Sequence, residues 1–374
     1  MKNFTAGKYI TQDNYSSFQP EFINRIWQID DMELLNLLSL ADRNIGRLDM
    51  YSEYVPNVNL FIGMHIVKEA TQSSKIEGTQ TNIEEAILPK NELIQEKRDD
   101  WEEVQNYISA LNKAIEELNN LPFSTRLIKS THKVLLDNVR GMNKMPGEFR
   151  VSQNWIGGTN INNATFIPPH HSTINQLMSD LEKFAHNDTI KIPELIKAGI
   201  IHYQFETIHP FLDGNGRVGR LLITLYLVSR GIIKIPVLYL SDYFERNRIQ
   251  YYDNLTRVRE SNDINKWLKF FLTGIVETAR NGIKTFDSIL KLKQETDEKI
   301  KKLGNRASNA KKIIDYMYVQ PIISAIDARN ILNQSKPTVY KLLYDLMELE
   351  ILEERDIVSK NKSYVLEEYL KLFK

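Results

Sequence analysis

Residues 209–220 read HPFLDGNGRVGR, a polar and glycine-rich dodecamer that separates two strongly apolar segments. The segments on either side, 193–208 and 216–231, both have the apolar spacing of helices. Pro210 disfavours the α conformation at His209, so the first helix is expected to end there. The pattern therefore predicts a loop between two helices, with an imidazole at the mouth of the loop.

The middle of the dodecamer has the features of an anion-binding loop. Gly214, Asn215 and Gly216 can adopt backbone angles that turn successive N–H groups inward. The second helix starts here, so its free N–H groups and positive dipole end add to the same concavity. Arg217 and Arg220 are three residues apart, which places both guanidinium groups on one helix face. Together these features predict a phosphate site.

Two further side chains of the loop suit phosphate chemistry. Asp213 is its only carboxylate and would be repelled by phosphates unless a divalent cation such as Mg²⁺ lies between them. His209 titrates near neutrality and could take a proton from an attacking hydroxyl. Phe211 and Leu212 are more typical of core anchors. A Gly-Asn-Gly turn alone would favour a plain solvated turn, whereas the added histidine, aspartate and two arginines favour a site.

Most of the remaining chain has helical periodicity, so we expect a mainly α fold. The exception is 147–170, where β-favouring residues flank Gly-Gly and Asn-Asn pairs and predict a β-hairpin. Residues 306–374 show three short helical patterns and two β-like strips around a Lys-Asn-Lys turn, which is typical of a winged helix. Further helices are expected at 31–50, 57–76, 101–120, 123–136 with Ser124 as its N-cap, and 245–280, followed by an exposed connecting helix at 283–304.

The chain has 374 residues, which is room for two or three domains and a sizeable core. We expect an N-terminal helical region at 1–95 and a second helical bundle, which contains the dodecamer, at 96–280. A connecting helix at 281–305 is expected to lead to a winged-helix domain at 306–374.

The composition excludes several classes of protein. Lys+Arg and Asp+Glu both total 48, so no overall field attracts nucleic acid or an anionic membrane, and any polyanion site must be local. Cysteine is absent, which excludes disulfides, a thiolate nucleophile and a cysteine zinc site. The N-terminus lacks the apolar core of a signal peptide, and the run 221–240 is too polar for a membrane span. We therefore expect a soluble, cytoplasmic protein with no membrane partner.

The dodecamer resembles the signature of the Fic family, His-Pro-Phe-x-Asp/Glu-Gly-Asn-Gly-Arg-x-x-Arg, at every defining position. The resemblance implies a Fic-type helical bundle that transfers AMP from ATP to a Ser, Thr or Tyr hydroxyl of a target protein. It implies that His209 deprotonates that hydroxyl and that Asp213 holds Mg²⁺ on the α- and β-phosphates. It further implies that Gly214–Gly216 cradle the phosphates, that Arg217 contacts the β-phosphate and that Arg220 contacts the γ-phosphate.

The expected hairpin at 150–170 is similar to the Fic flap, which covers the active site and aligns the target segment by strand addition. On this resemblance Ile156, Gly157 and Gly158 would lie nearest the nucleotide. A glycine-bearing hairpin without any role is the alternative. Tyr251 lies in a helix that borders the adenine in the family, although a tyrosine there is otherwise typical of core.

A second resemblance lies upstream, at SSKIEG, residues 73–78. It fits the family's inhibitory pattern, Ser/Thr-x-x-x-Glu-Gly/Asn, here Ser73, Glu77 and Gly78. Ser73 and Glu77 are four residues apart and share a helix face. The resemblance implies that Glu77 pairs with Arg220, takes the place of the γ-phosphate and makes the enzyme self-inhibited. A solvated glutamate at a helix end is the alternative, and a third reading has Glu77 orient a water that removes AMP.

The C-terminal module leaves its partner open. Its expected recognition helix, 335–352, starts with Ser335 and Lys336 and could enter a major groove. However, residues 306–374 hold 11 Lys+Arg and 10 Asp+Glu, without the basic excess of most DNA-binding modules. We therefore rank protein docking above DNA binding. A DNA-binding regulator with a nucleotide-sensing Fic domain, transfer of another phosphate-containing group, and a homodimer all stay open.

Overall fold

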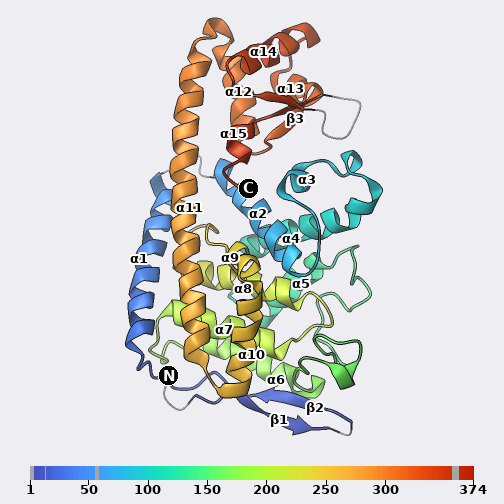
Figure 1. Cartoon of the computed structure of the whole chain (residues 1–374), viewed down its shortest axis with the longest axis vertical. Helices are drawn as coiled ribbons and strands as arrows, with labels where there is room; N and C mark the ends of the chain where they lie inside the picture. The colour runs from blue at the N-terminus through green and yellow to red at the C-terminus, as the bar shows by residue number, and fades with distance from the viewer. Residues whose placement is uncertain (1–3, 13, 55–58, 356–361) are drawn as a thin grey trace.

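The computed structural model describes residues 4–12, 14–54, 59–355 and 362–374 of the chain, and it is mainly helical (Figure 1). The predicted fold class is thereby confirmed. The helices are α1 (Met32–Tyr54), α2 (Asn59–Ile76), α3 (Ile83–Ile87), α4 (Arg98–Glu117), α5 (Thr125–Leu135), α6 (Ile174–His186), α7 (Glu194–Ile208), α8 (Asn215–Ser229), α9 (Ser241–Arg246), α10 (Arg248–Ser261), α11 (Ile264–Lys301), α12 (Ala307–Met317), α13 (Ala325–Leu332), α14 (Lys336–Glu348) and α15 (Glu367–Leu370). The strands are β1 (Gly7–Thr11), β2 (Ser16–Pro20), β3 (Ile322–Ser324), β4 (Glu353–Arg355) and β5 (Ser363–Val365).

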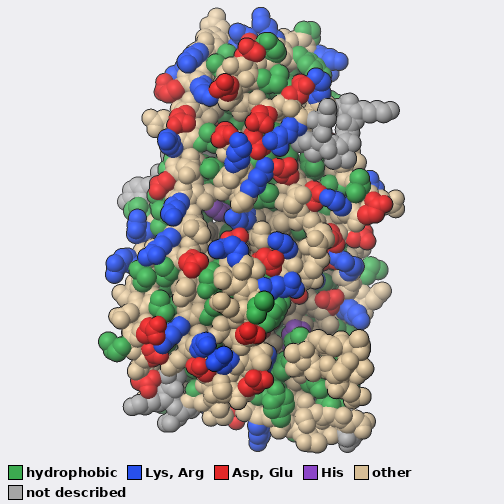
Figure 2. Space-filling model, viewed as in Figure 1, with side chains coloured by type: hydrophobic (Ala, Val, Ile, Leu, Met, Phe, Trp, Pro, Cys, Tyr) green, Lys and Arg blue, Asp and Glu red, His purple; other side chains and the backbone are tan. Residues whose placement is uncertain are grey.

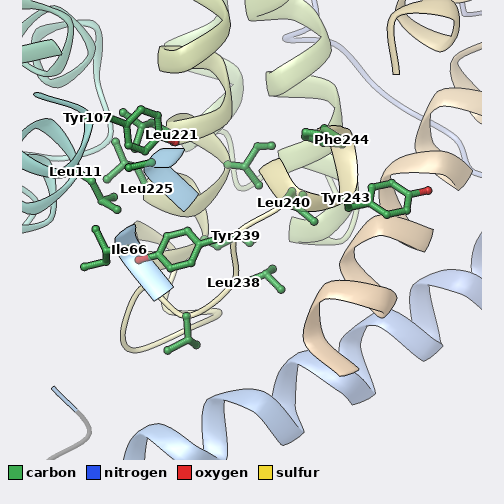
Figure 3. Close-up of a cluster of buried hydrophobic side chains, with 14 of the residues drawn as sticks. Ile66, Tyr107, Leu111, Leu221, Leu225, Leu238, Tyr239, Leu240, Tyr243 and Phe244 are labelled. Atoms are coloured by element: carbon green, nitrogen blue, oxygen red, sulfur yellow. The ribbon is translucent and has the colours of Figure 1, made fainter. Parts of the chain in front are cut away.

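Helices α7 and α8 lie side by side at the centre of the bundle and carry the dodecamer between them. Every residue of α7 from Leu195 to Ile208 is buried, including polar side chains such as His202 and Glu206. Gly199 lets α11 approach α7, because a Cβ there would lie 2.8 Å from Leu268 Cδ2. Figure 3 shows part of the surrounding core, with side chains from α2, α4, α8 and the segment 238–244.

The predicted connecting helix at 283–304 is wrong as a separate element. It is the second half of α11, a single helix of 38 residues that packs along α1 (Figure 1). Its apolar stripe is covered at Ile283, Phe286 and Ile289. The expected domain boundary at residue 280 therefore falls inside a continuous helix.

The segment 150–170 doubles back as expected but is hardly a β-hairpin. Its β pairing is limited to one antiparallel bridge between Ile156 and Phe166, with Ile156 N–H donating to Phe166 O at 2.8 Å. The turn between them is a short 3₁₀ helix over Ile161–Asn163, which Asn160 caps with its side chain. The polar residues thus bond within the turn instead of extending the strands.

A hairpin that the sequence did not indicate lies near the N-terminus. Strands β1 and β2 are antiparallel, with Tyr9 opposite Phe18. Phe18 is buried, and its backbone N–H donates to Ile167 O at 2.9 Å. This hairpin therefore supports the segment 150–170 from outside.

The C-terminal module contains α12–α15 and an antiparallel sheet of strand order β3-β5-β4. The three predicted helices and the β4–β5 pair are present, β3 was not predicted, and the winged-helix assignment stays a prediction. The expected Lys-Asn-Lys turn lies mostly outside the described residues. The module touches the rest of the chain through Gln320 Nε2, which donates to Ile87 O at 2.5 Å, and through Lys374 Nζ, 2.6 Å from Glu84 Oε1.

The surface agrees with the neutral overall charge. Basic and acidic side chains are interspersed on the face that Figure 2 shows. Within the described residues, no helix combines the length and the apolar content needed to cross a lipid bilayer.

Candidate active site

The dodecamer forms a closed loop between α7 and α8. His209 caps α7 in the left-handed conformation (φ 49°), and its N–H donates to Phe205 O at 2.9 Å. Gly214 is the N-cap of α8 with φ 74°, an angle that glycine adopts without strain. The side chain of Asn215 closes the loop, because Oδ1 accepts from Phe211 N–H at 2.8 Å and Nδ2 donates to Phe211 O at 2.9 Å. The amide of Asn215 shapes the loop, so any phosphate contact would come from its backbone.

The ring of His209 is kept neutral by its surroundings. Burial and the nearby charge of Arg150 lower its pKa to about 4. Nδ1 has no hydrogen-bond partner within the described part of the chain. Arg150, which sequence reasoning missed, supports the loop: its Nε donates to His209 O at 3.0 Å and its N–H to Pro210 O at 2.9 Å. A neutral imidazole held in this way can act as a base near pH 7.

His132 of α5 is a second support that the sequence did not reveal. Its ring stacks on Phe211 with centroids 3.7 Å apart. Nδ1 accepts from Gly147 N–H at 2.8 Å, so Nε2 carries the proton that it shares with Asp213 O at 3.0 Å. Burial lowers the pKa of His132 to about 4. The histidine is therefore a neutral clamp on the loop.

Asp213 is the one loop carboxylate and its side chain is half exposed. Its Oδ1 accepts from Gly214 N–H at 2.6 Å and lies 3.9 Å from Arg217 Nη2. Within the described residues no three His, Cys, Asp or Glu side chains gather as a metal site. A single accessible carboxylate fits Mg²⁺ bound together with a nucleotide, because Mg²⁺ takes most of its ligands from phosphates and water.

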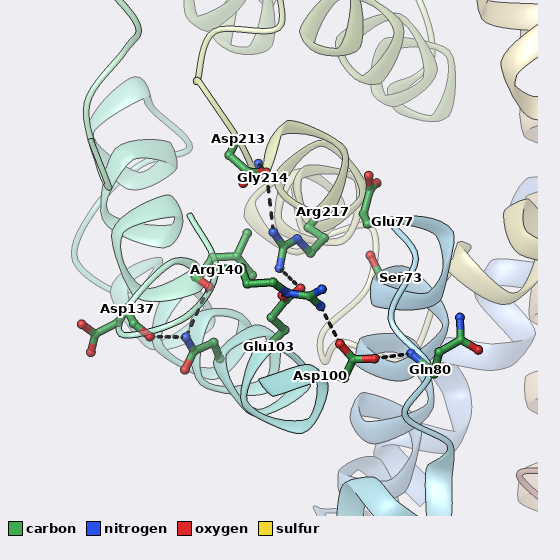
Figure 4. A network of polar contacts seen from close by, with 12 residues as sticks. Ser73, Glu77, Gln80, Asp100, Glu103, Asp137, Arg140, Asp213, Gly214 and Arg217 are labelled. Carbon is green, nitrogen blue, oxygen red and sulfur yellow. Dashed lines mark hydrogen bonds and ion pairs between the residues drawn. The ribbon is translucent and has the colours of Figure 1, made fainter. Parts of the chain in front are cut away.

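Arg217 is buried and already paired (Figure 4). Its Nη1 donates to Glu103 Oε2 at 3.1 Å, and Glu103 Oε1 accepts from Arg140 Nε at 2.5 Å. Nε of Arg217 has no partner in the described part of the chain. Glu103 on α4 therefore orients Arg217 and leaves it a free donor.

Arg220 joins the dodecamer to the upstream motif, as predicted. Its side chain is 1% exposed. Its Nε donates to Ser73 Oγ and its Nη2 to Ser73 O, both at 2.8 Å, and Nη2 also donates to Glu77 Oε1 at 2.7 Å. Burial opposes ionisation of Glu77, but the charge and hydrogen bond of Arg220 outweigh burial and lower its pKa. The contact is present, and its inhibitory role stays a prediction.

Two glycines make room for this arrangement. A Cβ on Gly216 would lie 2.2 Å from Glu77 Oε1, so only glycine lets that carboxylate rest against the first turn of α8. Gly78, with φ 108°, follows the end of α2 and turns the chain away. The Ser73–Glu77–Arg220 contact thus also depends on Gly216, which leaves space for the carboxylate, and on Gly78, where the chain turns away.

A cavity of about 510 Å³ lies in front of His209 and Arg220. The predicted nucleotide contacts that line it, together with Glu77, are Ile156, Gly157, Gly216, Arg220 and Tyr251. The predicted contacts Asp213, Gly214, Asn215 and Arg217 are not part of this lining. Gly158 is displaced from that lining, and a Cβ there would lie 2.3 Å from Asn163 O. Sequence reasoning missed the lining residues Trp155, Thr165, Phe166, Glu206, Arg248, Tyr252, Leu255, Thr256 and Arg259.

Among the lining residues, Tyr251 already has a hydrogen-bond partner, whereas one carboxylate oxygen of Glu206 has none within the described residues. Tyr251 is buried, and its hydroxyl forms a hydrogen bond with the buried His202 ring, whose Nε2 is 2.9 Å away. Glu206 is 8% exposed and its Oε1 has no partner within the described residues. Burial raises the pKa of Glu206 to about 7. Gly219 provides its space, since a Cβ there would lie 2.1 Å from Glu206 Oε1.

Two family models match the chain. The one described as Fic/DOC family N-terminal matches residues 35–116, and the one described as Fic/DOC family matches residues 122–227. Protein adenylyltransferase Fic of Aedes aegypti is 32% identical over 125 residues, which are 33% of this chain and 22% of that protein. A probable protein adenylyltransferase of Aquifex aeolicus is 30% identical over 160 residues, 41% of this chain and 45% of that protein. The chain thus spans less than half of these relatives.

Solved structures agree in fold. A Fic family protein from Desulfovibrio desulfuricans has a TM-score of 0.58 at 21% identity and covers 91% of this chain and 98% of its own. Fic-1 from C. elegans has a TM-score of 0.50 at 19% identity, over 70% of this chain and 75% of its own. At such identities the likeness concerns the fold alone.

Proposed function

Because the chain carries Fic/DOC family domains over residues 35–116 and 122–227, we propose that it is a protein adenylyltransferase that transfers AMP from ATP to a Ser, Thr or Tyr hydroxyl of a target protein. The observation that carries this proposal is the loop between α7 and α8. It sets a neutral histidine, His209, beside a cavity whose lining also includes Arg220 and Gly216 in the first turns of α8. Relatives named protein adenylyltransferase support the same reaction.

The residues of the loop divide the work of the reaction. His209 takes the proton of the target hydroxyl, whose oxygen forms the new bond to the α-phosphorus. The bond between the α-phosphorus and the bridging oxygen breaks on the opposite side, and pyrophosphate leaves. The N–H groups at the start of α8 and the guanidinium of Arg217 would stabilise the charge on the leaving group. Asp213 would hold Mg²⁺, which supplies further positive charge to the phosphates.

We further propose that the protein is self-inhibited through Glu77. Nε and Nη2 of Arg220 are already bonded to Ser73 and Glu77. A γ-phosphate that needs the same guanidinium would meet a carboxylate in its place and be repelled by it. ATP bound without Arg220 would hold its α-phosphate out of line with His209.

Labelled ATP tests the proposed reaction. The Glu77→Gly protein, incubated with ATP labelled on the α-phosphate, should pass the label to protein, and His209→Ala in the same background should abolish the transfer. Label that arrives from the γ-phosphate instead would identify a phosphate transfer and reject AMP transfer. Mass spectrometry of the labelled protein identifies the added group and the modified hydroxyl.

Removal of AMP is a second activity that the position of Glu77 allows. Its carboxylate is 35% exposed and lines the cavity that also contains His209, so it could orient a water towards a modified target. Purified AMP-modified protein should then lose AMP in the presence of the unaltered enzyme but not of Glu77→Gly. Release of AMP by both proteins would reject this second activity.

A further inference from the structure

A groove on the surface of the bundle has no part in the chemistry described above. It lies between the exposed faces of α5 and α6, has a volume of about 980 Å³ and is closed at one side by residues 146–149. Its basic residues are Lys113, Arg126, Lys129, Lys133 and Lys183, whereas its acidic ones are Glu148 and Glu182. We call it the basic groove.

The carboxylates of the basic groove are already engaged. Glu148 pairs with Lys129 at 2.9 Å, and Glu182 accepts both the N–H and the hydroxyl of Thr125 at 2.7 Å. The side chains of Arg126 and Lys133 are exposed, and within the described residues they form neither a hydrogen bond nor a salt bridge. In a chain with equal numbers of basic and acidic residues, this is a local excess of free positive charge.

The basic groove lies next to the catalytic loop. Its wall at residues 146–149 continues directly into Arg150, whose Nε and N–H donate to His209 O and Pro210 O. Gly147, in the same wall, donates its N–H to the His132 ring that stacks on Phe211. The groove is therefore joined to the catalytic loop through residues 147–150, but it shares no lining residue with the cavity in front of His209, so a target protein would have to extend beyond that cavity to reach it.

We propose that the basic groove docks an acidic stretch of the protein that receives AMP, a proposal that rests on the proposed transfer to protein. Arg126, Lys129 and Lys133 form one stripe along α5, spaced by three and four residues. At ~1.5 Å of helix rise per residue the stripe spans roughly 10 Å. An extended chain places side chains on one face every ~6–7 Å. A segment with an acidic residue at every second position can therefore place carboxylates near the long, flexible side chains of Arg126 and Lys133 at the two ends of the stripe.

The lining favours protein over nucleic acid. Single-stranded nucleic acids are held by exposed aromatic rings on which bases stack. Phe149 is the one aromatic side chain other than His186 among the residues that line the groove, and it is only 9% exposed. Lys129 covers its ring at 4.6 Å from the centroid. Charge is thus available in the groove, but a stacking surface is not.

Fluorescence anisotropy tests the proposal without ATP. The probe is a fluorescein-labelled 16-residue peptide of alternating glutamate and serine, titrated with the full chain at low salt. The double variant Arg126→Glu/Lys133→Glu should bind it about tenfold more weakly, because two attractions are replaced by two repulsions. The matched control is Lys266→Glu/Lys284→Glu, which makes the same charge change at exposed positions of α11 and should bind as the unaltered protein does.

The outcomes separate this proposal from the proposed function. Equal binding by the groove variant and the control, or preferred binding of a labelled single-stranded DNA of the same length, would overturn the docking proposal. Label transfer that still depends on His209 would leave the reaction standing in that case. If peptide docking is correct, the groove variant in the Glu77→Gly background should also transfer less AMP to added proteins than the control variant does.

Discussion

Replacing Glu77 by glycine should lower stability and raise AMP transfer together. Removing one partner of a fully buried ion pair costs about 3–5 kcal/mol, whereas exposed pairs contribute about 0–1 kcal/mol. Arg220 is 1% exposed, but Glu77 is 35% exposed, and both hydrogen bonds of Arg220 to Ser73 remain. We therefore expect the free energy of unfolding in urea to fall by about 1–2 kcal/mol at neutral pH.

In the unaltered protein, a γ-phosphate must break the Glu77–Arg220 pair before it can bind Arg220. Glu77→Gly removes this cost of about 1–2 kcal/mol. At ATP concentrations below saturation, the rate of label transfer should therefore rise roughly 5- to 30-fold. Lys75→Gly is the matched control, because it adds a glycine two residues away, at an exposed position that makes no contact with Arg220. It should lose stability without gaining activity.

The stability that the Glu77–Arg220 pair contributes should decrease as the pH falls. Arg220 lowers the pKa of Glu77, so the pair stabilises the fold above the ordinary pKa of a carboxyl and is lost as the pH falls through the lowered value. The difference in unfolding free energy between the two proteins should therefore shrink as the pH falls below the ordinary pKa of a glutamate and through the lowered pKa of Glu77. A variant that loses this stability but transfers AMP no faster would refute the inhibitory role of Glu77.

Three further predictions concern the loop and its neighbours. With the pKa of His209 at about 4, AMP transfer by Glu77→Gly should stay constant from neutral pH to about pH 5; an acid midpoint near 6.5 would contradict this. Glu206, with a pKa of about 7, is held protonated by the fold, so stability should fall as the pH rises from about 4.5 to 7, and Glu206→Gln should remove that slope in urea unfolding. Asn215→Ala breaks both hydrogen bonds to Phe211 and should cost about 2 kcal/mol, measured by urea unfolding, and most of the transfer activity.

The parts of the site that follow from local chemistry could be predicted from the sequence. The end of α7 at His209 follows from Pro210, and the start of α8 follows from the glycines. The meeting of Glu77 with Arg220, 143 residues later, was expected only because both motifs resemble a family pattern. Periodicity and spacing alone do not bring two distant segments together.

The supports of the loop could not be predicted, because each comes from elsewhere in the chain. Arg150, His132 and Glu103 lie 59, 81 and 114 residues from the loop residues that they contact. In the sequence each is an ordinary polar residue in or near a helix, with no spacing that marks it. Only the packing of α4, α5 and the segment around Arg150 against the dodecamer makes them neighbours.

The two errors of secondary structure have physical causes. The change from an apolar pattern in 245–280 to a charged one in 283–304 favoured two helices, yet α11 continues through Gly282, where α1 packs closely: a Cβ at Gly282 would lie 3.0 Å from Leu48 Cδ1. In 150–170 the turn residues were read correctly, but Asn163 and Arg150 satisfy backbone groups that a hairpin would use in its ladder. Hydrogen bonds from side chains to the backbone thus take the place of strand pairing in this segment. The β propensity of the residues does not predict such bonds.

The position of Glu77 relative to α2 decides how the contact with Arg220 can open. Glu69, on α2 itself, is buried and accepts three hydrogen bonds, from the Tyr107 hydroxyl at 2.8 Å and from the Ser241 N–H and hydroxyl at 3.1 and 2.6 Å. Moving α2 as a body would leave these buried groups unsatisfied at about 1–3 kcal/mol each. Glu77 follows the last residue of the helix, so it can swing away for the loss of one ion pair, about 1–2 kcal/mol. We therefore expect the Glu77–Arg220 contact to open by movement of the Glu77 side chain while Ser73 and α2 stay in place, so that Arg220 keeps its two hydrogen bonds to Ser73.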